Sequence, residues 1–119
     1  PLHQRWIPWN DASHHSVNLY NLLFQKLSSL YDDISVNESK YWRTFKRGTK
    51  SFATVNPTTN GLRILLSCKH TELSDPKCLV RKSTSSLGWG KKYPSEINFN
   101  QEELLDYVIY LIQQAYMKL

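Results

Sequence analysis

The sequence predicts an α+β domain in which an N-terminal helix and a C-terminal helix pack on one face of an antiparallel meander of about five to six strands. Two observations indicate this class. Apolar residues recur at steps of three and four near both ends of the chain, which is the spacing of amphipathic helices. Between them, short segments rich in aromatic and β-branched residues alternate with turn signals. The sheet face without helices is then expected to carry charge.

The first helix is expected over residues 14–31. Ser13 is predicted to cap it, since a hydroxyl can accept a hydrogen bond from the first turn. His14 and His15 lie in that turn and are expected to be exposed, because no carboxylate or thiol is spaced to serve them. The apolar stripe of this helix is formed by Tyr20, Leu23, Phe24, Leu27, Leu30 and Tyr31.

Strands are expected from Ile34 to Phe99. Gly48 separates "YWRTFKR" from "SFATVN" and predicts a turn between two paired strands. "NPTTNG" predicts a second hairpin connection, with Asn60 and Gly61 suited to positive φ. The most apolar segment, "GLRILLSC", is expected to be a central strand. Two more segments, "CLVRKST" and "SEINF", complete the expected sheet.

The second helix is expected over residues 101–117. Asn100 is predicted to cap it, and Glu103 stands where the acid of a capping box belongs. Its apolar face is formed by Leu105, Val108, Ile109, Ile112, Ala115, Tyr116 and Leu119.

The 119 residues predict one domain at 13–119, preceded by a linker or docking arm at 1–12. The apolar residues Trp6, Ile7 and Trp9 are expected to pack on this domain or on a neighbour. The chain begins with Pro1, so we expect it to be the C-terminal part of a longer protein. It contains no signal peptide and no apolar run of membrane-spanning length, and cysteine is sparse, so a cytoplasmic location is expected.

The two cysteines, Cys68 and Cys78, are ten residues apart. Together with His70 they offer three zinc ligands, but a closed structural zinc site needs four ligands at tighter spacing. Buried free thiols are the favoured interpretation. No metal and no cofactor are therefore predicted.

Positive charge is concentrated in the middle of the chain. Between Lys40 and Lys92 twelve Lys and Arg residues stand against two acids, a net charge of +10, although the whole chain carries only +5. The densest stretch is "KYWRTFKRGTK", where aromatic and basic residues interleave without an acid. Such clustering attracts phosphates, and it predicts binding of a nucleic acid backbone in preference to a merely soluble surface. The phosphate-binding residues are predicted to be Lys40, Arg43, Lys46, Arg47, Lys50, Lys91 and Lys92.

"SLGWGKKY" holds Trp89 between two glycines and directly before two lysines. Two roles are open for its ring. It can stack on a base beside the cations, or it can fold inward as a plug while the glycines supply the turn. Packing is favoured because Trp is highly buried on average, and the loop still contributes to binding if the plug holds Lys91 and Lys92 in place.

No catalytic site is predicted. Asp32, Asp33 and the triplet Glu38-Ser39-Lys40 have the residue types of a metal-dependent nuclease, but their separation is too short for the usual strand crossover. Glu72 and Asp75 flank a loop, as acidic pairs on surfaces often do. No glycine-rich phosphate loop precedes a helix, and no nucleophile has a base partner.

Several segments in fixed order carry a resemblance. These are "KYWRTFK", "NGLRILL", "ELSDPKCLVR", "LGWG" and "LLDYVIYLIQQAY". They resemble a bacterial C-terminal domain family of unknown function, found in predicted transport proteins and joined to restriction-type nuclease modules. The family tends to show Gly-His-Trp-Gly where this chain has Leu87 and Gly88 before Trp89, so a chemical role of that histidine is missing here. The order of elements is more distantly similar to the YjbR-type double-wing fold.

The resemblance implies a non-catalytic module associated with nucleases in restriction or anti-phage defence proteins. Together with the charge pattern it predicts an accessory domain that binds nucleic acid and contacts other domains of its parent protein. The alternative is a docking or oligomerisation module anchored by Trp6 and Trp9. The sequence distinguishes neither DNA from RNA nor one base preference from another.

Overall fold

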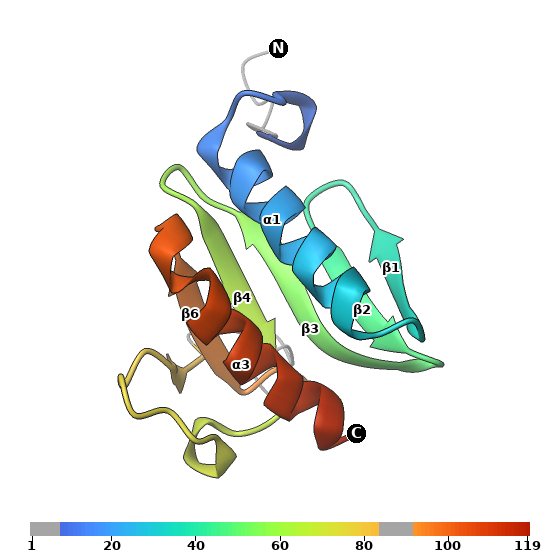
Figure 1. Cartoon of the computed structure of the whole chain (residues 1–119), viewed down its shortest axis with the longest axis vertical. Helices are drawn as coiled ribbons and strands as arrows, with labels where there is room; N and C mark the ends of the chain where they lie inside the picture. Colours follow the sequence, from blue (N-terminus) through green and yellow to red (C-terminus); the bar gives the residue numbers. More distant parts are fainter. Residues whose placement is uncertain (1–7, 84–91) are drawn as a thin grey trace.

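The computed structural model describes residues 8–83 and 92–119, and it confirms the predicted α+β class (Figure 1). No helix among these residues has the length and hydropathy needed to cross a membrane. The helices are α1 (His15–Leu30) and α3 (Leu105–Met117), with short 3-10 turns η1 (Pro8–Asn10), η2 (His70–Glu72) and η3 (Glu102–Leu104). The strands are β1 (Ile34–Glu38), β2 (Arg43–Arg47), β3 (Lys50–Pro57), β4 (Leu62–Leu66), β5 (Arg81–Lys82) and β6 (Ser95–Phe99).

The six strands form one antiparallel sheet in the order β1-β2-β3-β4-β6-β5. It departs from a simple meander only at β5, which is an edge strand outside β6. The expected strand "CLVRKST" forms ladder pairs at two residues, Arg81 with Glu96 and Lys82 with Ser95. The apolar segment β4 lies in the middle of the sheet as predicted, with Ile64 paired to Val55 on one side and to Ile97 on the other.

Both helices cover the same face of the sheet (Figure 1). α1 lies over the half with β2 and β3 and reaches β4, and α3 crosses from β6 over β4 to β3. Side chains alternate along a strand, so every second residue points into this layer. The strand residues buried beneath the helices include Phe45, Val55, Ile64, Leu66 and Ile97. We call this the helix-covered face, and the opposite side the helix-free face.

The predicted helix caps are wrong. α1 is capped by His14, whose Nδ1 accepts a hydrogen bond from the Ser16 N–H at 3.1 Å. Ser13 instead donates from its N–H and its hydroxyl to Asp11, at 3.0 and 2.6 Å. The backbone of His14 is extended, and its imidazole takes the place of the expected Ser13 hydroxyl as the acceptor.

The expected capping box of Asn100 and Glu103 is also absent. The chain enters α3 through the turn η3, and neither the Gln101 cap of η3 nor the Leu104 cap of α3 makes a side-chain hydrogen bond. The carbonyl of Asn100 contacts His15 Nε2 at 2.8 Å, which places the N-terminal ends of the two helices beside each other.

Two glycines are needed for different reasons. Gly48 forms the predicted β2–β3 turn, and its φ of 62° lies in the left-handed region. The positive φ expected at Asn60 and Gly61 is not found, since Cys78 is the one non-glycine residue with positive φ among the described residues. Gly61 is required instead by crowding, because a Cβ there would overlap the Phe99 carbonyl oxygen and come within 2.8 Å of Asn100 Cα.

Gly61→Ala is therefore expected to lower the free energy of unfolding by about 2–3 kcal/mol, as overpacking against rigid backbone does. Gly48→Ala serves as control, since its Cβ meets nothing within 4 Å and only the left-handed conformation costs about 1 kcal/mol. Urea denaturation measures both. Equal losses for the two variants would show that the close approach at Gly61 is relieved at no cost.

Candidate nucleic-acid interface

The predicted basic stripe on β2 is divided between the two faces of the sheet. Phe45 is buried in the helix-covered core, so Arg43 and Arg47, two residues to either side, share its face. Thr44 and Lys46 point to the helix-free face, where the Thr44 hydroxyl lies 2.9 Å from that of Thr54. The cations that are neighbours in the sequence therefore do not form one surface.

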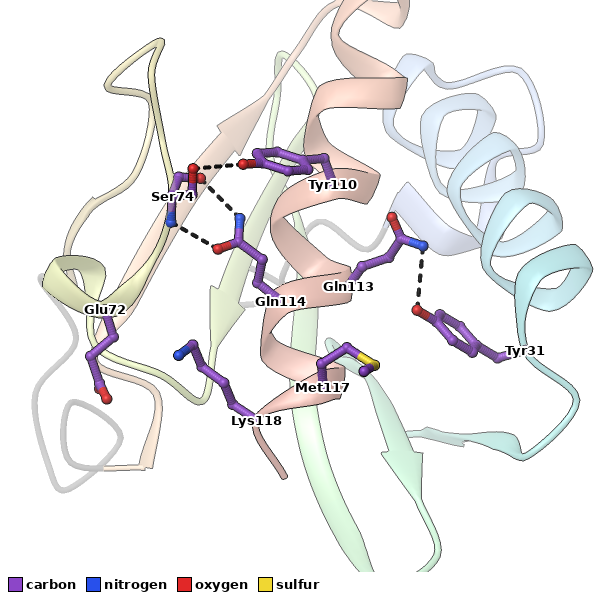
Figure 2. A pocket seen from close by; sticks show the side chains of 8 residues that line it. All are labelled: Tyr31, Glu72, Ser74, Tyr110, Gln113, Gln114, Met117 and Lys118. Atoms are coloured by element: carbon purple, nitrogen blue, oxygen red, sulfur yellow. Dashed lines mark hydrogen bonds between the residues drawn. The ribbon is translucent and has the colours of Figure 1, made fainter.

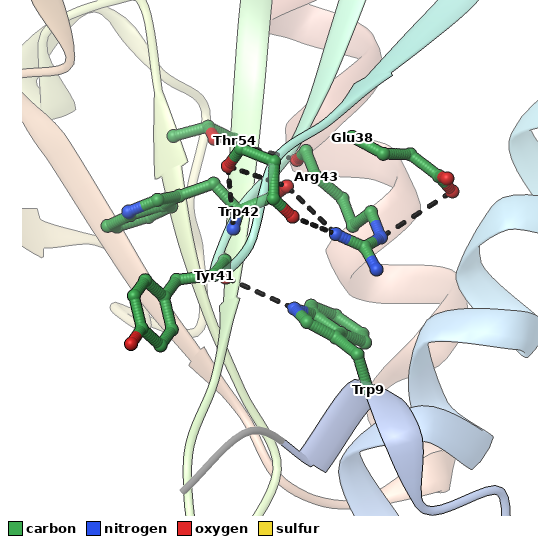
Figure 3. Close-up of polar contacts among 7 residues, drawn as sticks. Trp9, Glu38, Tyr41, Trp42, Arg43 and Thr54 are labelled. Carbon is green, nitrogen blue, oxygen red and sulfur yellow. Dashed lines mark hydrogen bonds and ion pairs between the residues drawn. The ribbon is translucent and has the colours of Figure 1, made fainter. Parts of the chain in front are cut away.

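Arg43 is held within the domain (Figure 3). Its guanidinium lies over the ring of Trp9, 4.5 Å from the centroid, and donates to the carbonyls of Ser39 and Trp42 at 2.7 and 3.1 Å. Its Nε lies 3.5 Å from a Glu38 carboxylate oxygen. The side chain is only 15% exposed. These contacts describe an arginine that joins the N-terminal segment to the sheet.

Trp9 packs on this domain, which is one of the outcomes expected for the N-terminal arm. Its indole N–H donates to the Tyr41 carbonyl at 3.1 Å (Figure 3). Its ring meets the Tyr20 ring edge-on, with the centroids 5.1 Å apart. Burial raises the pKa of Tyr20 to about 12. Trp6 and Ile7 lie outside the described residues.

Arg47 takes part in a network at the far end of the same strand. It forms an ion pair with Asp33 at 3.2 Å and lies over the ring of Tyr116, 4.7 Å from its centroid. The Tyr116 hydroxyl donates to both oxygens of Asp33, at 2.7 and 2.8 Å. This hydrogen bond and burial raise the pKa of Tyr116. Arg47 nevertheless keeps an exposed side chain, at 46%.

Two basic segments that are distant in the sequence meet at the end of the β2–β3 hairpin. Lys46 is paired in register with Ser51, and the Tyr93 hydroxyl donates to the Ser51 hydroxyl at 2.8 Å. Tyr93 is buried, and its neighbour Lys92 is exposed. Lys50 is exposed beside Ser51, and because it is paired with Arg47 its side chain leaves the sheet on the side opposite to Lys46. We call the group Lys46, Lys50 and Lys92 the hairpin-end lysines.

The remaining predicted residues lie elsewhere. Lys40 is exposed in the β1–β2 connection, at the other end of β2, with its ammonium 5.6 Å from the centroid of the Tyr41 ring. Trp89 and Lys91 lie outside the described residues, so the choice between a plug and a stacking platform stays open.

The helix-free face is not the open charged surface that was expected. Its middle is closed, because Thr54 and Leu65 are fully buried and Glu96 is 1% exposed. Arg63 and Arg81, from the strands on either side of β6, both bind the Glu96 carboxylate. None of these three charged residues is among the site residues predicted from the sequence. The register pairs Arg81 directly with Glu96, which only the strand order reveals.

The segment between η2 and β5 is organised by Asp75. Its carboxylate accepts the N–H groups of Leu79 and Val80, at 3.1 and 2.8 Å, and the hydroxyl of Tyr107 on α3. Burial alone would raise the pKa of Asp75, but the hydrogen bonds from Tyr107, Val80, Leu79 and Cys78 outweigh it and lower that pKa. Asp75 is thus a structural residue of this loop.

A groove of about 540 Å³ lies beside this loop, between the C-terminal half of α3, residues 72–74 and Tyr31 (Figure 2). Its polar side chains already serve one another. Gln114 accepts from the Ser74 N–H at 2.8 Å and donates to the Ser74 carbonyl at 2.9 Å, and the Tyr110 hydroxyl donates to the Ser74 hydroxyl at 2.6 Å. On the other side Gln113 donates to the Tyr31 hydroxyl at 3.3 Å.

The acidic residues Asp32, Asp33 and Glu38, which have the residue types of a metal-dependent nuclease, do not form a cluster among the described residues. Among the described residues no group of three His, Cys, Asp or Glu side chains could hold a metal ion. Asp33 and Glu38 are bound to Arg47 and Arg43 at opposite ends of β1.

The cysteines differ from each other. Cys68 is buried as expected, and burial raises the pKa of its thiol. Cys78 is exposed, at φ 55°, because the loop around Asp75 turns sharply there, so the expectation of a second buried thiol is wrong.

A family model described as "Domain of unknown function (DUF5655)" matches residues 8–118. An uncharacterized protein of Haemophilus influenzae is 30% identical over 105 residues, which cover 88% of this chain and 34% of the relative. The chain therefore spans about a third of the length of that relative. No solved structure matches the chain.

Arg43→Ala is expected to lower the free energy of unfolding by about 1–2 kcal/mol, because it removes a half-enclosed cation–π contact and two charged hydrogen bonds. Lys46→Ala, on the same strand but the other face, should change it by less than about 0.5 kcal/mol. Thermal or urea unfolding compares them. Arg43→Ala unfolding like the wild type would show that Arg43 does not join Trp9 to the sheet.

Asp75→Asn is expected to cost about 1–3 kcal/mol at neutral pH, because an amide cannot accept the same set of hydrogen bonds. Since the folded-state pKa of Asp75 is lowered, its contribution is complete above the ordinary value of 3.8 and is lost as the pH falls through the folded-state pKa. The variant should lack this part of the acid-induced loss of stability.

Asp106→Asn is the matched control, because this carboxylate is 86% exposed and lies 3.6 Å from Lys26. It should cost well under about 1 kcal/mol. Equal denaturation curves for the Asp75 and Asp106 variants between neutral and acidic pH would contradict the role given to Asp75.

Proposed function

Because the chain belongs to the DUF5655 family, whose description assigns no activity, we propose a function from the chain's own geometry. It is a non-catalytic accessory domain that binds the phosphate backbone of nucleic acid. The observation that carries this proposal is the meeting of the hairpin-end lysines. The Tyr93–Ser51 hydrogen bond joins two segments 42 residues apart, so Lys92 and the lysines of the hairpin surround one end of it, with Lys46 on the helix-free face and Lys50 on the opposite side.

The surroundings of these lysines favour an anionic partner. No Asp or Glu occurs between Glu38 and Glu72 in the sequence, so both strands of the hairpin lack acids. Asp33, which precedes β1 at the same end of the sheet, is already paired with Arg47. Among the described residues no ion pair involves Lys46, Lys50 or Lys92. Their charges are available to phosphates, which gain from the release of condensed counterions.

The shape of the hairpin is suited to this role. Figure 1 shows the β2–β3 turn reaching the edge of the molecule, beyond the end of α1. Because β1 pairs with β2 as far as Arg47, this turn belongs to a broad sheet edge, which meets phosphates at the surface of a nucleic acid. Lysines contribute point charges and not a base-reading fork, so binding should depend little on sequence. Lys40 adds a further cation in the β1–β2 connection, beyond the other end of β2, which is about 13 Å long.

The wider context is part of the proposal. The Haemophilus influenzae relative is about three times as long as the matched segment, which supports a domain that acts within a larger protein. The resemblance adds a bacterial parent of restriction or defence type in the cytoplasm. Trp89 and Lys91 belong to the proposed interface on sequence grounds alone.

Protein docking is the second candidate, and a different observation favours it. Met117, Leu30, Tyr110 and Leu119 are exposed by 69, 44, 40 and 37%. Tyr110 and Met117 lie on α3, Leu119 follows it, and Leu30 ends α1. Trp9 is occupied within the domain and is not an available anchor.

The combined variant Lys46→Ala, Lys50→Ala and Lys92→Ala is expected to weaken binding of short duplex and single-stranded oligonucleotides similarly for all sequences. If three phosphate contacts are lost, the slope of log affinity against log salt should flatten by about 2–3 units. Fluorescence anisotropy at several salt concentrations measures both quantities.

The matched control is Lys26→Ala, Lys69→Ala and Lys118→Ala, which removes the same charge from other parts of the surface. It should reduce affinity less and leave the slope nearly unchanged. If both triple variants behave alike, binding reflects net charge only. If the wild-type domain binds no nucleic acid but captures a parent segment through the apolar end of α3, docking replaces the proposal.

A further inference from the structure

A buried carboxylate on the helix-free face holds two arginines. The Glu96 side chain is 2% exposed, and each of its oxygens accepts from one guanidinium. Arg63 donates to Oε1 from Nε and Nη2 at 3.0 and 2.9 Å. Arg81 donates to Oε2 from Nε and Nη2 at 3.1 and 2.6 Å. The three residues come from neighbouring strands, in the order β4, β6 and β5.

This cluster is not balanced in charge. One carboxylate faces two guanidiniums, so these three side chains retain one positive charge. Arg63 and Arg81 are 28 and 55% exposed, so both reach solvent while Glu96 does not. Each guanidinium has five N–H groups, and Nη1 of both arginines has no hydrogen-bond partner among residues 8–83 and 92–119.

A purely structural role does not account for both arginines. Arg81 fastens the two-residue strand β5 to the sheet, but Arg63 joins β4 to β6, which already share five ladder pairs. Burying an ion pair is costly, and apolar residues of similar volume often stabilise a protein as well or better. The arrangement does orient two guanidiniums beside each other.

We propose that Arg63 and Arg81, oriented by Glu96, form a second phosphate-binding site that takes a phosphodiester group. Guanidiniums bind phosphate oxygens through parallel N–H bonds, and the single excess charge matches the single charge of a phosphodiester. That the phosphodiester belongs to nucleic acid rests on the proposed function.

The position of the pair fits a backbone that also reaches the hairpin-end lysines. Lys46, Arg63 and Arg81 all point to the helix-free face, and β2 and β5 are four strand spacings apart, or about 19 Å. A strand bound at both places crosses the sheet over its buried middle. The lysines then supply attraction, and the arginine pair fixes the position of one phosphate.

The first test is Arg81→Ala, measured with a short thymidine oligonucleotide. Affinity is expected to fall roughly five- to tenfold, and the salt slope to flatten by about 0.7 units, the value for one contact to a single strand. Arg81→Lys should recover only part of the affinity, because an ammonium cannot serve Glu96 and a phosphate with the same fork. Lys118→Ala is the control for loss of one exposed charge.

Unfolding midpoints of the same variants separate binding from folding. A lowered midpoint with unchanged affinity and slope would overturn the proposal and leave Arg81 as a fastener of β5. If the hairpin-end variant loses affinity and Arg81→Ala does not, the second site is wrong and the proposed function stands.

The second test does not depend on nucleic acid. Dimethyl phosphate, the simplest phosphodiester, is titrated while the Nε–H signals of the arginine side chains are followed by NMR. Arg63 and Arg81 should shift together and saturably, and Arg43, enclosed by Trp9 on the other face, should not. Shifts in a domain that binds no oligonucleotide would retain the site and refute the proposed function. Uniform or absent shifts would refute the site.

Discussion

The sheet has one apolar face that two helices must cover, and this constraint decides which charges of the domain are available to a partner. Burying each large aliphatic or aromatic side chain there contributes about 1.5–3 kcal/mol to stability. Phe45, which is fully buried, must therefore point to the helix-covered face. Strand alternation then assigns its neighbours. Arg43 and Arg47 share the face of Phe45 and find acids and rings within the domain, while Lys46 faces away from the helices.

Helix α3 also fixes the segments that lie outside the sheet core. One side of it packs on the sheet through Val108, Ile112 and Ala115. Its flanks carry hydrogen-bonding side chains that hold neighbouring segments, with Tyr107 on Asp75, Gln114 on Ser74 and Tyr116 on Asp33. The segments "LLDYVIYLIQQAY" and "ELSDPKCLVR" therefore meet in the structure. The contacts between these two segments account for the residues that carry the family resemblance there through packing and loop organisation.

The sequence predicts the fold well because periodicity reports burial directly. It predicts the caps poorly, since His14 and Ser13 compete for the same role within one turn of chain. Strand alternation around the buried Phe45 predicts that Arg43 and Arg47 lie on one face of the sheet and Lys46 on the other. A count of charges along the chain does not distinguish the two faces. The contact of Tyr93 with Ser51 and the pairing of Arg63 and Arg81 on Glu96 were not readable, because they depend on strand order between distant segments.

The two kinds of cation are used differently. Every arginine of the described residues has a carboxylate partner inside the domain, whereas among the lysines of that part of the chain only Lys26 forms an ion pair, with Asp106. A guanidinium loses less freedom per hydrogen bond and suits fixed internal geometry, while an ammonium on a flexible stem stays hydrated and adaptable. Under the proposed function, such a surface attracts phosphates without reading bases. The pairing at Glu96 differs, because its single negative charge is shared by Arg63 and Arg81 and both guanidiniums also reach solvent.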